Sequence, residues 1–345
     1  MATQDRPLAS ATGGGAAAAV AADVADPGDI PIKARSFWEQ VWRRFRRDRV
    51  ALASVVVIIL MLLAAYVAAP VASHILGRGP NSINLNANAY QPEGPWTYIT
   101  SASGHGKSLY ILGTADPTGR DEFLRMLYGA QVSLEVGVFS TVVGMLVGVA
   151  LGLLAGFYGG IVDTLVSRAT EIVMAFPLLL FVIALASTVG PRLNSYTLFG
   201  AFEPGVMMLT IVIAAFSWYY PARVVRAEVL SLREKEFVEA ARMVGAGDLR
   251  IMRKHLIPHL TGVVVVLTTL SIATNILLEA GLSYLGVGIP LPTASWGNLI
   301  SDAVQYYTTQ PWLIIWPGVA ILIATLCFNL LGDGLRDAID PRATR

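Results

Sequence analysis

Residues 132–154 read VSLEVGVFSTVVGMLVGVALGLL, a mostly apolar run long enough to cross a bilayer as a helix. A helix needs about 20 such residues to span the hydrocarbon core. Five further stretches reach about this length: Val50–Ile75, Thr164–Val189, Val206–Val225, Gly262–Leu282 and Trp312–Leu331. The sequence therefore predicts an all-α membrane protein with six transmembrane helices.

The composition supports a membrane protein. Apolar residues make up 54% of the 345 positions and charged residues only 14%, whereas soluble domains carry roughly 25% charge. The net charge of +1 creates no overall positive potential that would attract nucleic acid, so we expect no nucleic-acid partner. The single cysteine, Cys327, excludes an internal disulfide framework. We interpret it as a packing residue.

Glycines recur at every fourth position of the second predicted span and just beyond it: Gly144, Gly148, Gly152, Gly156 and Gly160. Small residues at this spacing let two helix backbones approach closely. We therefore expect a helix to pack on this stripe, and we expect assembly with a neighbouring membrane subunit to depend on it.

The positions of lysine and arginine predict the orientation. With a cytoplasmic N-terminus, twenty of the 25 basic residues lie on the cytoplasmic side. The five on the other side are Arg78, Lys107, Arg120, Arg125 and Arg192. Because cytoplasmic loops are enriched in basic residues, both termini are predicted to be cytoplasmic.

The remaining segments follow from this topology. Residues 1–35 are rich in Ala, Gly, Asp and Pro, which predicts a disordered cytoplasmic tail. Residues 36–49 carry an aromatic face and an arginine face, which suits either an interfacial amphipathic helix or a simple basic anchor. The other boundaries are a first transmembrane helix at 50–76, an extracytoplasmic segment at 77–130, a five-helix core at 131–332 with a cytoplasmic loop at 226–260, and a cytoplasmic C-terminus at 333–345.

The cytoplasmic loop contains the stretch REKEFVEAARMVGAGDLRIMRKHLIP, residues 233–258. Its first twelve residues are good helix formers, and Gly245 or Gly247 can end that helix in the left-handed conformation. Asp248 can cap a second short helix, which Pro258 would end. Two basic helices joined at a glycine turn could dock another protein, although a solvated amphipathic loop would use the same residues.

Several motifs resemble those of binding-protein-dependent ABC permeases. Glu239-Ala240-Ala241, Gly245 and Leu256-Ile257-Pro258 are similar to the EAA loop of that family. Further similar segments are Leu112-Gly113-Thr114, Gly119-Arg120-Asp121, Tyr128-Gly129-Ala130, Leu282–Gly288, Trp296-Gly297 and Gly332–Asp337. The resemblance covers roughly residues 36–342 and is specific to the C-type subunit of the dipeptide and oligopeptide group.

This resemblance implies a permease subunit with the type I ABC importer fold, in a bacterial inner membrane. The implied partners are a second, different permease subunit, one or two ATPase subunits and an extracytoplasmic solute-binding protein. Coupling to the ATPase is implied for Glu239, Ala240, Ala241, Gly245, Asp248, Leu256 and Pro258. The implied cargo is a di- or oligopeptide, while relatives of this architecture carry nickel chelates, glutathione or sugars.

Three polar residues in the predicted spans are candidates for the translocation path: Asn275, Glu279 and Asn329. Polar groups at membrane depth usually face a cavity or a partner. Glu279 could instead hold structure near the outer mouth, and Asn329 could make an interhelical hydrogen bond. In the third span, Arg168 and Glu171 could pair, with Asp163 contributing.

No nucleotide-binding signature is complete in the chain. Gly104-His105-Gly106-Lys107-Ser108 ends like a Walker A loop, but Ser101 stands where that motif requires its first glycine. We therefore expect this chain to be no enzyme and to bind no cofactor or metal, with ATP and magnesium on its partners. The alternative class is an ATP-independent secondary transporter, for which internal repeats would be expected.

Overall fold

The computed structural model describes residues 37–104, 106–193, 200 and 202–339. By its internal contacts the chain divides into two units, Met1–Gln40 and Val41–Arg345. The described part of the first unit begins helix α2 (Phe37–Phe45), at the place of the predicted amphipathic helix. The tail predicted at residues 1–35 lies outside the described residues.

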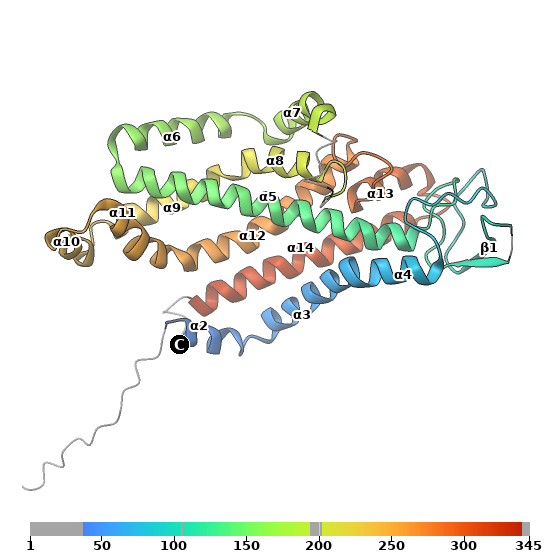
Figure 1. The fold of residues 1–345 in the computed structure, drawn as a ribbon, viewed down its shortest axis with the longest axis horizontal. Helices are drawn as coiled ribbons and strands as arrows, with labels where there is room; N and C mark the ends of the chain where they lie inside the picture. The colour runs from blue at the N-terminus through green and yellow to red at the C-terminus, as the bar shows by residue number, and fades with distance from the viewer. Residues whose placement is uncertain (1–36, 105, 194–199, 201, 340–345) are drawn as a thin grey trace, which may run out of the picture. The chain divides into compact units, whose positions relative to one another are not determined.

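The second unit is built from long helices, with the short helices α10 and α11 at one end and a two-stranded sheet at the other (Figure 1). Its helices and strands are α3 (Arg49–Leu63), the π-helical turn η1 (Ala64–Ala68), α4 (Ala69–Leu76), β1 (Thr97–Thr100), β2 (Lys107–Tyr110), α5 (Glu122–Tyr158), α6 (Gly160–Ala175), α7 (Leu178–Leu193), α8 (Val206–Ser217), α9 (Tyr219–Leu232), α10 (Glu236–Met243), α11 (Asp248–Ile251), the π-helical turn η2 (Met252–Leu256), α12 (Ile257–Tyr284), α13 (Trp296–Ala303), the 3₁₀ turn η3 (Val304–Tyr306) and α14 (Trp312–Ile339).

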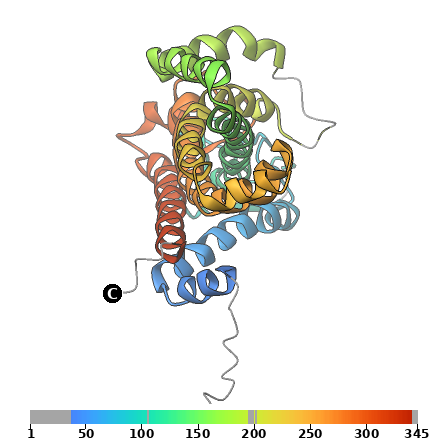
Figure 2. The same cartoon turned by 90° about the vertical axis from the view of Figure 1, so that its left-hand side faces the viewer.

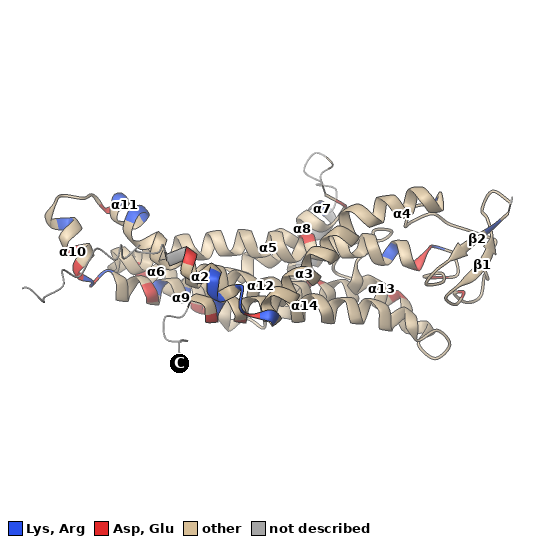
Figure 3. Ribbon diagram, turned by 90° about the horizontal axis from the view of Figure 1, so that it is seen from below, with Lys and Arg blue, Asp and Glu red and all other residues tan. Residues whose placement is uncertain are grey.

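Four continuous helices of the described chain are long and apolar enough to cross a membrane: Arg49–Leu76, Glu122–Tyr158, Asp248–Tyr284 and Trp312–Ile339. Two bent pairs pass the same criterion, α8 with α9 at 40° and α6 with α7 at 92°. With each pair taken as one span there are six, so the predicted all-α class with six spans is confirmed. In Figure 3 the middle of α14 carries few charged residues, whereas lysines and arginines gather around α10 and α11.

The third predicted span, 164–189, differs most from the expectation because the chain turns sharply in its middle. Pro177 separates α6 from α7, and Phe176 before it is extended with ψ 136°. Proline disfavours a helical conformation in the residue that precedes it. The composition predicts one apolar segment here, but the backbone forms two helices.

The glycine stripe of α5 is covered by α9 of the same chain. A Cβ atom on Gly148 would lie 2.6 Å from the carbonyl oxygen of Trp218, and one on Gly152 would lie 2.5 Å from that of Ala222. Figure 2 looks along the helices and shows α5, α9 and α12 side by side. The expectation that this stripe serves a neighbouring subunit is therefore wrong. Gly160 does not join the stripe, because it begins α6 with a φ of +54°.

The segment between α4 and α5 is held on the first turn of α5. In the sheet, β1 and β2 are antiparallel, with Thr97 opposite Tyr110. Asp121 caps α5 by accepting a hydrogen bond from the backbone nitrogen of Leu124 (3.2 Å), and the Nε of Arg78 donates to the same carboxylate (2.8 Å). Gly113 has a φ of +86°, and a Cβ atom there would overlap the backbone of Glu93.

The first span is joined to α5 inside the bundle. The hydroxyl of Tyr66, in the π-helical turn η1, donates to Glu135 of α5 at 2.9 Å. At the other end of this span, Asp48 caps α3 by accepting from the backbone nitrogen of Val50 (2.8 Å). Small side chains are fully buried at both places, with Ala51 near Asp48 and Ala65 beside Tyr66.

Helices extend past the predicted segment boundaries at several places. Helix α5 begins at Glu122, inside the predicted extracytoplasmic segment; α9 continues to Leu232, inside the predicted loop; and α14 continues to Ile339. Hydropathy marks where apolar residues end, whereas a helix continues until a capping residue or a turn stops it.

We predict that Gly152→Ala lowers the melting temperature of the purified protein in detergent. Overpacking of this kind costs about 1–3 kcal/mol, and the added methyl would meet backbone atoms of α9. Gly318→Ala in α14 is the matched control, because nothing lies within 4 Å of a Cβ there. The control should keep or raise the melting temperature, since alanine favours a helix by roughly 0.5–1 kcal/mol over glycine. Equal melting temperatures for both variants would contradict this packing.

Candidate functional site

The first candidate site is the helical hairpin formed by α10 and α11. Helix α10 is amphipathic: Val238 is fully buried, Phe237 and Ala241 are half-buried, and Glu239 and Ala240 are exposed. The buried face packs on the ends of α5 and α9, so the hairpin has a fixed base.

A glycine turn ends α10. Gly245 has a φ of +82°, and its backbone nitrogen donates to the carbonyl oxygen of Arg242 (2.9 Å). The backbone nitrogen of Ala246 donates to Ala241 (3.0 Å), which completes a Schellman motif. Of the two glycines proposed for the left-handed position, Gly245 therefore holds it. Gly247 is extended, with a φ of −70°.

The predicted cap of the second short helix is wrong. Gly247 is the N-cap of α11, Asp248 is its first helical residue, and no side chain caps this end. A carboxylate in the first turn still interacts favourably with the helix dipole. Asp248 is exposed at the tip of the hairpin.

The predicted helix end at Pro258 is also wrong. Helix α11, the turn η2 and helix α12 form one helix from Asp248 to Tyr284. Pro258 lies in the first turn of α12, directly after the π-helical turn. The wider hydrogen-bonding pattern of a π-turn, seen in the bond from Ile257 back to Met252, accommodates the proline ring without ending the helix. The hairpin is therefore continuous with the fifth span.

The base of the hairpin is an apolar cluster. Leu256, one of the predicted coupling residues, is fully buried in it and so supports the hairpin from within. The ring of Phe237 stacks on His259 with a centroid distance of 5.0 Å. The buried members are Leu153, Phe157, Val225, Val229, Leu232, Val238, Ile251, Met252, Leu256 and Leu260.

The tip of the hairpin exposes large apolar side chains that the sequence analysis did not single out. Met243 is 83% exposed, Val244 90% and Leu249 74%. Exposed cations, among them Arg250 and Arg253, lie beside them. The sequence feature that could have identified this patch is the presence of apolar residues on both sides of a glycine turn inside a charged loop. Such a patch with a polar rim is typical of a protein-binding surface.

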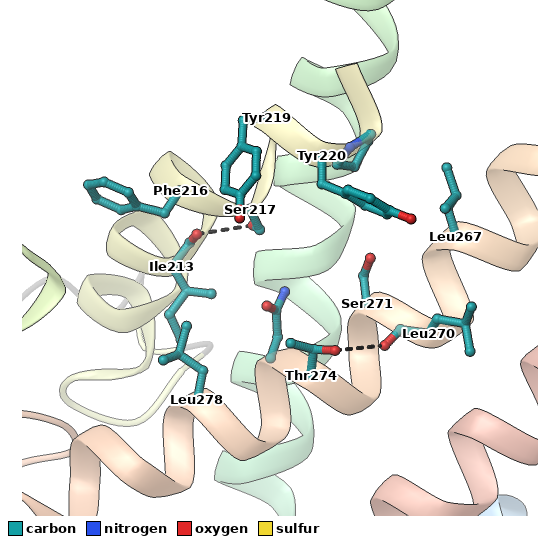
Figure 4. Close-up of a pocket in the computed structure, with 12 residues that line it drawn as sticks. Ile213, Phe216, Ser217, Tyr219, Tyr220, Leu267, Leu270, Ser271, Thr274 and Leu278 are labelled. Carbon is teal, nitrogen blue, oxygen red and sulfur yellow. Dashed lines mark hydrogen bonds between the residues drawn. The ribbon is translucent and has the colours of Figure 1, made fainter. Parts of the chain in front are cut away.

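The second candidate site is a cavity of about 320 Å³ between α8, α9 and α12 (Figure 4). Asn275 lines it and donates a hydrogen bond to the hydroxyl of Thr141 (2.9 Å). Its lining residues are Ile213, Phe216, Ser217, Tyr219, Tyr220, Pro221, Leu267, Leu270, Ser271, Thr274, Asn275 and Leu278.

The structure does not bring the three path candidates together. Glu279 is fully buried away from the cavity and accepts a hydrogen bond from the hydroxyl of Ser283 (2.7 Å). Asn329 is exposed on α14, and its side chain has no hydrogen bond with another described residue. The sequence analysis missed Ser271 and Thr274, which line the cavity together with Asn275. Ser271 precedes the other two by three and four positions, the spacing of neighbours on a helix face.

The charged residues of α6 pair as expected except for Asp163. Arg168 and Glu171 form the predicted ion pair (2.7 Å), and both side chains are exposed. Asp163 does not join them. It accepts two hydrogen bonds from Arg226 of α9, one of them from Nη2 at 2.7 Å.

The sequence matches place the chain in a family. The model of the binding-protein-dependent transport system inner membrane component matches residues 148–345, and that of the N-terminal TM domain of oligopeptide transport permease C matches residues 36–92. The chain therefore belongs to the family of binding-protein-dependent transport system inner membrane components. The expected permease fold of type I ABC importers is confirmed by this membership.

Two relatives align over nearly the whole chain. The oligopeptide transport system permease protein OppC of Escherichia coli (strain K12) is 37% identical over 313 residues, which cover 91% of this chain and 94% of that one. The glutathione transport system permease protein GsiD of Shigella sonnei (strain Ss046) is 36% identical over 312 residues, covering 90% and 93%.

Two solved structures were also matched. The inward-facing MetNI methionine ABC transporter has a TM-score of 0.49 at 20% identity, covering 63% of this chain and 96% of that one. An amino acid ABC transporter crystallised with histidines has a TM-score of 0.45 at 19% identity, covering 61% and 92%.

We predict that Gly245→Val loosens the hairpin tip. A β-branched residue at positive φ is strongly disfavoured, so the Schellman hydrogen bonds should open. Limited trypsin digestion should then cut faster after Arg242 and Arg250. Gly247→Val is the matched control, because that glycine is extended and nothing lies within 4 Å of an added Cβ at either position. Equal cleavage rates in the two variants would show that Gly245 does not hold the turn.

Proposed function

We propose that this chain is the permease subunit of an ATP-driven importer that takes up di- or oligopeptides delivered by an extracytoplasmic binding protein. The observation that carries the proposal is the apolar tip of the α10–α11 hairpin on a helix continuous with a span that lines a cavity. The similarity to OppC supports peptide cargo. The nearly equal similarity to GsiD makes glutathione, itself a small peptide, the second candidate.

The proposed assembly contains a second permease subunit, one or two ATPase subunits and the solute-binding protein, all surrounded by membrane lipid. In this assembly the chain itself hydrolyses nothing and holds no cofactor, while ATP and magnesium bind to the ATPase subunits. The membrane is the inner membrane of a bacterium, as the family description suggests.

The hairpin is suited to transmit ATPase movement because it joins the two helices that border the cavity. Helix α9 ends at Leu232, just before the hairpin, and the helix from Asp248 to Tyr284 begins within it. Tyr219 and Tyr220 of α9 face Ser271 and Thr274 of α12 across the cavity (Figure 4). Coupling requires that the ATPase contact the hairpin differently in its two states. A displacement of the tip then changes the spacing of the cavity walls.

We predict that Leu249→Gln weakens recovery of the ATPase subunit about tenfold when the complex is pulled down, because burying a leucine is worth about 1.5–3 kcal/mol. Levels of the variant in the membrane should stay normal, since Leu249 is 74% exposed in the chain itself. Leu85→Gln, at an equally exposed leucine (85%) of the outer segment, is the matched control and should leave recovery unchanged. Full recovery with Leu249→Gln would argue for a merely solvated loop.

The orientation that we propose places α10 and α11 in the cytoplasm and the β1–β2 sheet outside. Cys327 is the only cysteine, so a Cys327→Ser background allows single-cysteine labelling. We expect Ser103→Cys and Ser301→Cys to react with a membrane-impermeant maleimide added to intact cells, and Ala246→Cys to react only after lysis. Labelling at position 246 from outside would reverse this topology.

A further inference from the structure

Four exposed arginines lie at the junction of α2 and α3, immediately before the first span. Arg43 is in the last turn of α2, Arg46 and Arg47 follow in the connecting turn, and Arg49 is the first residue of α3. We call these four residues the arginine cluster. So dense a group of cations at the start of a span calls for anions to neutralise it.

The arginine cluster has no ionic partner within the described part of the chain. None of the ion pairs found there involves one of its four arginines. Asp48, which stands among them in the sequence, uses its carboxylate to cap α3 and accepts from the backbone nitrogens of Val50 and Ala51. The guanidinium of Arg46 lies 5.1 Å from the centroid of the Trp42 ring. The positive charges can therefore be shared with an anionic group from outside the chain.

The junction is fastened to the helix bundle. Val41 and Phe45 of α2 are buried against Ala51 of α3 and Ala338 of α14. Trp42, between them in the sequence, is 54% exposed. The last turn of α2 therefore keeps one apolar face on the bundle and leaves its tryptophan and its arginines on the outside.

The arginine cluster also stands at the end of an exposed apolar stripe on α3. Ala53, Val56, Leu60 and Leu63 follow Arg49 at alternating spacings of four and three, so the five share one helix face. Val56 is 56% exposed and Leu60 58%. On a span, such a face meets the acyl chains of a bilayer, and the residues just before it lie at the depth of the headgroups. Arginine and tryptophan are both typical of that depth.

We propose that the arginine cluster, together with Trp42, binds the headgroups of anionic phospholipids. Each basic residue close to an anionic membrane surface strengthens binding roughly fivefold. In the orientation proposed above, the cluster faces the cytoplasmic leaflet, whose surface potential is negative. An acidic surface of a partner subunit would carry the same charge. Phospholipid is favoured because the cluster is continuous with the apolar stripe of α3, and a bilayer presents anionic headgroups directly beside acyl chains.

The test measures lipids retained by the full-length chain in neutral detergent, by native mass spectrometry. Phosphatidylglycerol and phosphatidylcholine with the same acyl chains are offered at equal concentrations. The wild-type chain should retain more phosphatidylglycerol. The combined substitutions Arg43→Gln, Arg46→Gln and Arg47→Gln should lower the ratio of the two bound lipids by about fivefold or more, since one such charge is worth roughly fivefold. The same three positions changed to lysine should keep most of the ratio, because lysine retains the charge.

Three exposed cations of the α10–α11 hairpin provide the matched control: Arg250→Gln, Arg253→Gln and Lys254→Gln. They lie eight to twelve positions before Gly262, the predicted start of the fifth span. That is about 12–18 Å along the helix, beyond the Debye length of about 8–10 Å. The ratio of bound lipids in this control should stay within about twofold of the wild type.

Three results of the lipid-binding measurement would overturn the proposal. The first is a wild-type chain without preference for phosphatidylglycerol. The second is an unchanged ratio in the glutamine variant of the cluster, which would assign the arginines to a partner subunit instead. The third is an equal loss in the hairpin control, which would show a general attraction by net charge. Each result stands whatever solute the protein transports.

A second measurement determines the depth of the junction directly. In the Cys327→Ser background, a spin label on Trp42→Cys is studied in vesicles of equal parts phosphatidylcholine and phosphatidylglycerol. Its collisions with oxygen and with a water-soluble nickel chelate should place it at the level of the headgroups. A label on Ser103→Cys, at an exposed serine, is the aqueous reference. Equal access of the chelate to both labels would remove the arginine cluster from the membrane surface and overturn the site.

Discussion

The close approach of α5 and α9 is the contact on which the rest of the bundle depends. Glycines at 148 and 152 leave no room for a side chain between the two backbones. Because α9 is held there, its other faces are directed toward α12, where the cavity lies, and toward α6. The same contact places the end of α9 beside the end of α5, on which the hairpin base is built.

A second structural feature is that the hairpin and the fifth span form one continuous helix. A flexible loop would absorb a displacement of its tip, whereas an unbroken helix of 37 residues from Asp248 to Tyr284 conveys it. The π-helical turn at Met252–Leu256 keeps that helix intact around Pro258. Buried Ile251 and Leu256 fasten it to the core.

The motifs shared with peptide permeases have distinct structural roles. The residues around Gly113, Gly119 and Asp121 attach the segment between α4 and α5 to the start of α5 through tight turns, an N-cap and the Arg78 ion pair. In α13, Gly297 lies against the backbone of Ala280, where a Cβ would not fit. These positions require small or capping residues for packing, so the motifs identify the fold more directly than they identify the cargo.

The sequence by itself determined the membrane class, the number of spans, the family and a glycine turn at Gly245 or Gly247, because apolar length and a left-handed glycine depend on local chemistry. The structure then assigned the left-handed position to Gly245. It also predicted the Arg168–Glu171 pair from spacing along one helix. Only the tertiary structure decided which helix covers the glycine stripe, which polar residues share a cavity, and that Asp163 pairs with Arg226, 63 positions away. Those outcomes depend on how helices distant in sequence pack, which periodicity within one helix does not encode.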